Sequence, residues 1–181
     1  QTYPDRDNKA YQVTVYTLTV SAGVGTGGAS RTWDALRFMP FLNATPGSSG
    51  YTLLALSPTM VGLADPIEAT SPLYKPDYSV HNRPSIEDGA FVIPNHSTHY
   101  IHAGPMTLTF SGGAGWGSAG CIEVVGFTSM KAYIHSLSGL TTKGEEDALT
   151  ELVKKRMLTI KLERAVRPSV NELAMPPGFT W

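Results

Sequence analysis

Glycine and proline divide this chain into short segments, and that limits the folds open to it. The 181 residues include 18 glycines and 13 prolines, a larger share than the roughly 12% of average usage. Charged residues make up only 16% of the chain, where about a quarter is usual. We therefore expect short strands joined by many turns rather than long charged helices. Apolar residues make up 41% and occur in periodic runs, which excludes a disordered chain.

Length, charge and cysteine content exclude several classes of protein. At about 150 residues per domain, the chain is expected to form one domain over residues 1–181, with residues 1–10 and 168–181 at its periphery. The formal net charge of −1 lacks the basic footprint of a nucleic-acid-binding protein. No apolar run approaches the roughly 18 residues of a membrane span. A single cysteine excludes an intramolecular disulfide. Because the first residue is Gln1, we expect a processed or trimmed N-terminus.

The first half of the chain has few regular patterns. The segment Tyr11–Val20 is rich in β-branched and aromatic residues that partly alternate, which predicts a strand. Thr32–Leu42 is compatible with a strand or a short helix, and Tyr51–Leu56 with a buried strand. Ser57–Gly89 holds five prolines, so it is expected to be a functional loop or to carry short elements with no clear pattern.

Short strands are also predicted further along the chain, at Phe91–Ile93, Thr98–His102, Met106–Phe110, Cys121–Val125 and Leu158–Leu162.

Two helices are predicted near the C-terminus. Apolar residues from Phe127 to Leu137 share one helical face, and Gly139 is expected to end that helix. Thr142-x-x-Glu145 matches a capping box for a second helix, with acidic residues in its first turn and the basic residues 154–156 in its last. The predicted fold class is therefore α+β and rich in strands, a mixed sheet with two helices in the C-terminal region.

Three of the five histidines lie at His96, His99 and His102, which invites a metal-binding interpretation. However, the predicted strand places His99 and His102 on opposite faces. His96 and His102 would share a face but lie about 20 Å apart along it. A metal site is therefore disfavoured. We expect His96, with His81, His99 and His135, to be at the surface or hydrogen-bonded, although His99 could also line a cleft.

The only cysteine, Cys121, lies in the glycine-rich setting GSAGC. A thiol beside an imidazole is readily held as a nucleophilic thiolate. Glycines let the backbone approach a substrate closely and form an oxyanion hole with its N–H groups. A lone cysteine is also commonly a buried structural residue. Position alone leaves both interpretations open.

The letters IHAG at 101–104, followed by SAGCI at 118–122, resemble the active-site signature of the L,D-transpeptidase (YkuD-type) family. That signature has a His-x-Gly-like strand end, a gap, and then [Ser/Thr]-x-Gly-Cys with a hydrophobic residue. The order of histidine before cysteine separates it from papain-like peptidases. The resemblance covers His102 to Gly126 and implies an L,D-transpeptidase-like β-sandwich or mixed sheet.

The resemblance also implies a role for each matching residue. Cys121 would be the nucleophile and His102 its base, with Gly120 at the oxyanion hole and Ser118 supporting the histidine or the loop. In this family a backbone carbonyl commonly orients the histidine. No cofactor and no metal are implied. Residues expected to bind substrate are His99, Gly104, Trp116 and Ala119. For Trp116, a packing role is an equal alternative.

One position departs from the family pattern. Glu123 stands where the transpeptidases usually have arginine or asparagine, which favours a secreted branch over ordinary cell-wall cross-linking. That branch comprises type VI secretion effectors that resemble L,D-carboxypeptidases; a phage-associated group of unknown function shares the pattern. The resemblance then implies a secreted or delivered antibacterial enzyme that acts on peptidoglycan stem peptides in the periplasm, with an immunity protein as a further partner.

Two other functions remain open on the sequence. A catalytically inactive module would use the same cleft to bind a wall peptide, or the tail near Pro176 to bind a partner. A cysteine peptidase or amidase would cleave another peptide bond.

Overall fold

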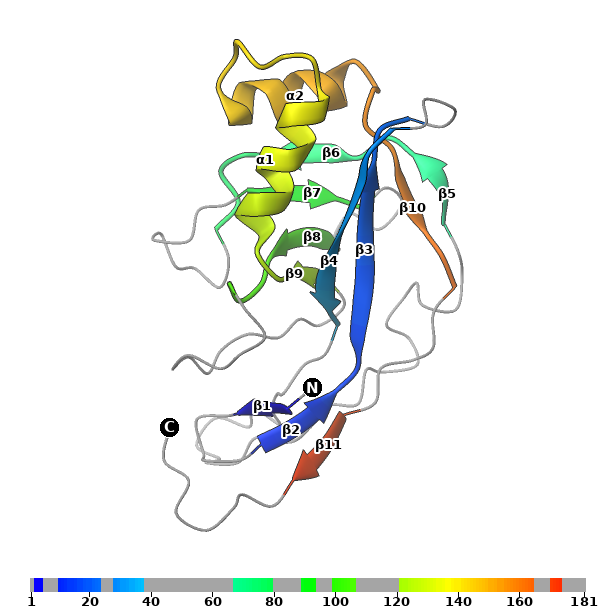
Figure 1. The fold of residues 1–181 in the computed structure, drawn as a ribbon, viewed down its shortest axis with the longest axis vertical. Helices are drawn as coiled ribbons and strands as arrows, with labels where there is room; N and C mark the ends of the chain where they lie inside the picture. Colours follow the sequence, from blue (N-terminus) through cyan, green and yellow to red (C-terminus); the bar gives the residue numbers. More distant parts are fainter. Residues whose placement is uncertain are drawn as a thin grey trace.

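The computed structural model has an α+β fold rich in strands, built from a mixed six-stranded sheet and two helices (Figure 1). The structure describes residues 2–4, 10–23, 28–37, 67–79, 89–93, 99–106, 121–164 and 170–173.

The six-stranded sheet carries the order β3-β4-β9-β8-β7-β6. Neighbouring strands are antiparallel except for the central pair β8 and β9, which run parallel. A parallel pair needs a long crossover, and residues 104–121 make this connection. The strands are β3 (Val15–Ser21), β4 (Ser30–Leu36), β6 (Leu73–Lys75), β7 (Ala90–Val92), β8 (Tyr100–Ala103) and β9 (Ile122–Val124).

Two smaller sheets complete the described structure. In one, β2 (Ala10–Val13) pairs with both β1 (Thr2–Pro4) and β11 (Val170–Leu173), so it joins segments from the two ends of the chain. In the other, β5 (Ile67–Thr70) pairs with β10 (Ile160–Leu162).

Most strand predictions within the described residues are confirmed, with shifted ends. The predicted strand Tyr11–Val20 is divided at Thr14 into β2 and β3, which belong to different sheets. Thr32–Leu42 is a strand as far as Leu36. The proline-rich stretch 57–89 contains β5 and β6. Predictions for Tyr51–Leu56 and for residues 107–110 lie outside the described residues.

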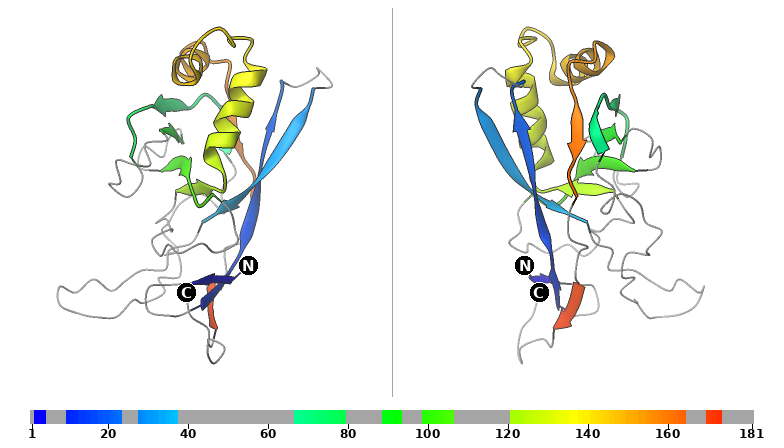
Figure 2. Two further views of the ribbon diagram at one scale, coloured as in Figure 1. Left: turned by 60° about the vertical axis from the view of Figure 1, so that its left-hand side comes forward. Right: turned by 90° about the vertical axis from the view of Figure 1, so that its right-hand side faces the viewer.

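The helix α1 (Phe127–Leu137) begins directly after β9 and confirms its prediction. Gly126 makes the sharp turn between them with φ +72°, a conformation that favours glycine, and its N–H donates to Pro105 O at 3.1 Å. Gly139, predicted to end the helix, has φ +70°. The helix lies across one face of the twisted sheet (Figure 2).

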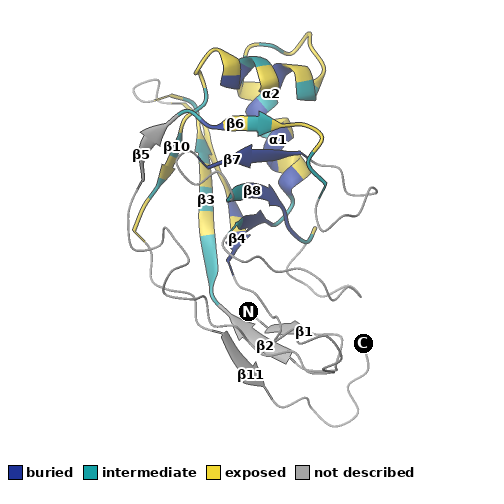
Figure 3. Cartoon of the chain, turned by 180° about the vertical axis from the view of Figure 1, so that it is seen from behind, coloured by how far each residue is buried: buried dark blue, intermediate teal, exposed yellow. Residues whose placement is uncertain are grey.

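The hydrophobic core lies between this face of the sheet and the two helices. Figure 3 shows that β7 and β8, which are inner strands of the sheet, are mostly buried, whereas the edge strand β3 is partly exposed. Alternate residues of the central strands point into the core, so the residues between them point to the opposite face. The buried core residues are Trp33, Ala35, Phe91, Ile93, Ile101, Ala103, Ile122, Val124, Phe127, Met130, Ile134, Leu149, Leu152 and Val153.

The helix α2 (Glu145–Lys154) has the acidic first turn and the basic last turn that its sequence predicts. The predicted capping box is wrong, because the N-cap is Gly144 and no side chain caps the helix. Among the described residues, neither helix is long and apolar enough to cross a membrane.

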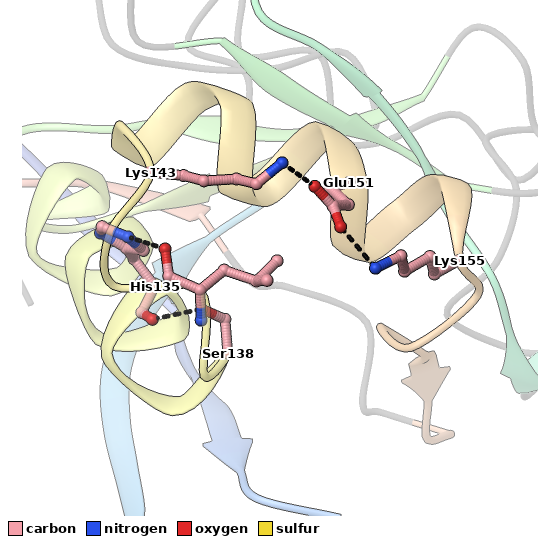
Figure 4. A network of polar contacts seen from close by, with 6 residues as sticks. His135, Ser138, Lys143, Glu151 and Lys155 are labelled. Carbon is pink, nitrogen blue, oxygen red and sulfur yellow. Dashed lines mark hydrogen bonds and ion pairs between the residues drawn. The ribbon is translucent and has the colours of Figure 1, made fainter.

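The corner between the helices is held by polar contacts (Figure 4). Glu151 of α2 accepts from Lys143 and pairs with Lys155. His135 Nε2 lies 3.3 Å from Leu140 O, so this histidine is hydrogen-bonded as predicted.

Candidate active site

The parallel pair β8 and β9 brings the predicted nucleophile and its base to the same face of the sheet. The register aligns His102 with Glu123 and Ile101 with Ile122. Cys121 therefore lies beside Tyr100, and the Tyr100 N–H donates to the Cys121 Sγ at 3.4 Å. The Cα atoms of Cys121 and His102 are offset by two residues along the strands and one strand across, about 8 Å. Ile101, Ala103, Ile122 and Val124 alternate with these residues and pack in the core with α1, so this face is the one turned away from the helix.

The imidazole of His102 is held in one orientation by the backbone. Its Nδ1 lies 2.9 Å from Ala103 O, and the side chain is buried at 3% exposure. A carbonyl oxygen can only accept, so Nδ1 carries the proton and donates. Nε2 is then the ring nitrogen that can accept a proton from a thiol. Cys121 itself is half-buried, which leaves part of it accessible.

Two tyrosine rings pack beside this pair. The Tyr78 ring centroid lies 4.8 Å from that of Tyr100 and 5.7 Å from that of His102. Burial raises the pKa of Tyr78 to about 12, and the negative charges of Cys121, Tyr100 and Glu123 add to the effect. Its hydroxyl therefore stays protonated at neutral pH. On the solvent side, Lys75 Nζ lies 5.3 Å from the Tyr100 ring centroid and donates to its hydroxyl at 3.5 Å.

Two buried charged residues lie close to the cysteine. Glu123, fully buried, is on the same face as Cys121 and aligns with Leu36 of β4. Arg37, which follows Leu36, is only 6% exposed. Burial lowers the pKa of Arg37, and the negative charges of Tyr16 and Cys121 oppose that shift. A guanidinium in this position favours the thiolate form of Cys121.

Three residues of the site, Tyr78, Tyr100 and Arg37, were not predicted from the sequence. Alternation along the predicted strands was the available signal for Tyr100, which shares a face with His102. The same rule places Glu123 beside Cys121. No sequence pattern connects Tyr78 or Arg37 to the cysteine, because both reach it through pairing between distant strands.

The remaining predicted site residues fall into two groups. His99 precedes β8 and is half-buried, and its carbonyl accepts from the Ile93 N–H at 3.0 Å. Gly104 is buried against β9, where an added Cβ would lie 3.0 Å from Val124 O. The structure thus gives Gly104 a packing role, and substrate binding by both residues stays a prediction. The others lie outside the described residues: Trp116, Ser118, Ala119 and Gly120.

A metal ion has no ready ligand set in the part of the chain that the structure describes. No group of three or more His, Cys, Asp or Glu side chains gathers there. His96 lies outside that part.

The fold and the site together describe an α+β protein with a cysteine and a buried histidine on one face of a mixed sheet. A comparison with protein-family models gives no match, and searches of the curated proteins and of the solved structures likewise give none.

Proposed function

We propose that this chain is a cysteine-dependent acyl-transfer enzyme of the L,D-transpeptidase type that acts on peptidoglycan stem peptides. One observation carries the proposal: β8 and β9 set Cys121 beside the Tyr100 N–H and near His102, whose Nδ1 is fixed by Ala103 O. This arrangement leaves Nε2 as the proton acceptor. The signature around residues 101–104 and 118–122 supplies the substrate class by resemblance.

The proposed first step forms an acyl-enzyme. His102 Nε2 takes the proton of the Cys121 thiol, and the thiolate attacks the carbonyl of the L-centre residue, meso-diaminopimelate or lysine, before the terminal D-Ala. A carbon–sulfur bond forms and the peptide bond to D-Ala breaks. The imidazolium returns its proton to the leaving amine. Backbone N–H groups at Cys121 and Gly120 would stabilise the oxyanion.

In the second step the thioester is attacked by water or by an amine. Water releases a shortened stem and makes the enzyme an L,D-carboxypeptidase, whereas an amine gives transpeptidation or exchange of a D-amino acid. Buried Glu123 departs from the transpeptidase pattern, which favours the hydrolytic, antibacterial branch. In that branch the protein is delivered into the periplasm, and an immunity protein is its second partner.

The test is mass spectrometry of purified tetrapeptide muropeptides incubated with the protein. We expect the stem to lose its terminal alanine with wild type and not with Cys121→Ala or His102→Ala. Thr150→Ala, an exposed truncation on α2, is the matched control and should keep full turnover.

Three results would overturn the proposal. Turnover by a folded Cys121→Ala variant would exclude this nucleophile. Cleavage at another bond would indicate a peptidase or amidase. Binding of the muropeptide without any change in its mass would indicate a binding module.

A further inference from the structure

Tyr78 reaches the site from a rigid turn at the edge of the sheet. The segment Lys75-Pro76-Asp77-Tyr78 begins at the last residue of β6, and the Tyr78 N–H donates to Lys75 O at 3.4 Å. This bond closes a four-residue turn with proline at its second position, where the fixed φ of proline is favoured. The turn limits the backbone freedom of Tyr78. The turn fixes where the backbone of Tyr78 lies, and packing against Tyr100 and His102 places its ring.

The ring of Tyr78 lies against two side chains of β8 at once. Tyr100 and His102 point to the same face and stand about 6.6 Å apart along the strand. The Tyr78 centroid is 4.8 Å from the first ring, with the planes at 32°, and 5.7 Å from the second, with the planes at 42°. Both separations are within the range of favourable aromatic contacts. His102 is thus held by a hydrogen bond at Nδ1 and by an aromatic ring at its side.

We propose that Tyr78 is a positioning residue for His102, whose ring keeps the imidazole turned so that Nε2 faces the Cys121 thiol. This inference rests on the proposed function, in which the two side chains exchange a proton. The hydrogen bond to Ala103 O fixes one ring atom, and the Tyr78 ring packs against the imidazole and limits rotation of its plane. The role belongs to the ring and not to the hydroxyl, so phenylalanine should replace it.

Titration of Cys121 can report this role because its titratable neighbours within the described part of the chain are identified. They are Tyr100 and His102 of β8, Glu123 of β9, Arg37 after β4, and Tyr78 itself. Tyr78 has a pKa of about 12, so it carries no charge where thiols and imidazoles titrate. Replacing it with an uncharged residue leaves the charge around the thiol unchanged. A change in the titration midpoint that Tyr78→Leu causes and Tyr78→Phe does not must then come from loss of the ring and not from a change in charge.

The experiment measures the rate of iodoacetamide alkylation of Cys121 against pH in the full chain. Tyr78→Leu should move the midpoint toward the free-thiol value of about 8.5. At any pH below both midpoints, a midpoint higher by about one pH unit means an alkylation rate about tenfold lower. Tyr78→Phe should keep the wild-type profile. The control is Tyr133→Leu, which removes a ring packed 5.5 Å from Trp33 on the helix side of the sheet. It should lower the melting temperature without moving the profile.

The outcomes separate this inference from the proposed function. If His102→Ala shifts the profile and a folded Tyr78→Leu does not, the positioning role is wrong and the Cys–His pair stands. A shift with Tyr133→Leu as large as with Tyr78→Leu would also overturn it, since general loosening would then explain both. If His102→Ala leaves the profile unchanged, the pair itself fails, and the positioning role with it. Circular dichroism confirms folding of each variant.

Discussion

Replacing Lys131 with methionine and with alanine should separate two contributions to stability, that of its ion pairs and that of its packed side chain. The Lys131 side chain on α1 is 4% exposed, and its Nζ lies 2.6 Å from Glu146 Oε1 and 3.4 Å from Glu145 Oε1 of α2. Removing one partner of a fully buried pair costs about 3–5 kcal/mol. Here the glutamates are 46% and 27% exposed, so they remain solvated when left alone. Lys131→Met keeps the packing, and we expect it to lower the free energy of unfolding by about 1–2 kcal/mol.

Lys131→Ala also removes three buried methylene groups. At about 0.8 kcal/mol each, this adds roughly 2.4 kcal/mol and brings the total loss near 4 kcal/mol. In a domain of this size 1 kcal/mol shifts the melting temperature by about 2–4 °C. The melting temperature should therefore fall by about 4 °C for the methionine variant and by about 12 °C for the alanine variant.

The control is Lys161→Met, in which an exposed lysine paired with exposed Glu163 is removed. Its melting temperature should stay at the wild-type value. A wild-type melting temperature for Lys131→Met would show that the ion pair stabilises nothing. Equal values for the methionine and alanine variants would show that the stem of Lys131 is not packed between the helices.

Three further predictions concern the helix ends, pH and metal dependence. Serine at Gly144, an uncapped N-cap with φ −60°, should stabilise the protein by a few tenths of a kcal/mol. The same change at Gly126 should lower the free energy of unfolding by about 1–2 kcal/mol because φ is +72°. Urea unfolding measures both effects, and stability changes of the same sign for the two variants would refute this. Hydrogen bonds from Lys143 and Lys155 lower the pKa of Glu151 from 4.5 to about 2, so its stabilising effect is present above pH 4.5 and lost as pH falls toward 2. The melting-temperature difference between wild type and Glu151→Gln should shrink over that range, and a constant difference would contradict the assignment. Dialysis against EDTA should leave turnover intact, and loss of activity together with stoichiometric zinc would reverse that view.

Local sequence patterns predicted the helices better than the strands. The apolar spacing from Phe127 and the stop at Gly139 depend on contacts within one helical turn, and both are confirmed. The capping box failed because Thr142 lies in the turn before the helix and Gly144 takes the N-cap. The strand through Thr14 failed as a single element because its two halves pair with different partners, β11 and β4, from distant parts of the chain.

The site could be predicted only for residues that a local sequence pattern identifies. The signature named His102 and Cys121 directly, and alternation implies that Glu123 shares their face. The parallel register that sets Tyr100 beside Cys121 joins residues 21 positions apart, and no local pattern specifies it. Tyr78 belongs to the proline-rich stretch 57–89, in which no hydrophobic periodicity is visible. Its place beside His102 follows from the pairing of β6 with β7 and not from its own sequence.

The central claim, that Cys121 forms an acyl-enzyme, is tested most directly by trapping that species. Wild-type protein is mixed with a tetrapeptide muropeptide, quenched in acid, and measured as an intact protein and then as a peptide digest. We predict a mass increase equal to the acyl group of the shortened stem, located on the peptide that contains Cys121 and absent from Cys121→Ala. An adduct on another residue, or turnover by the folded Cys121→Ala variant, would contradict it.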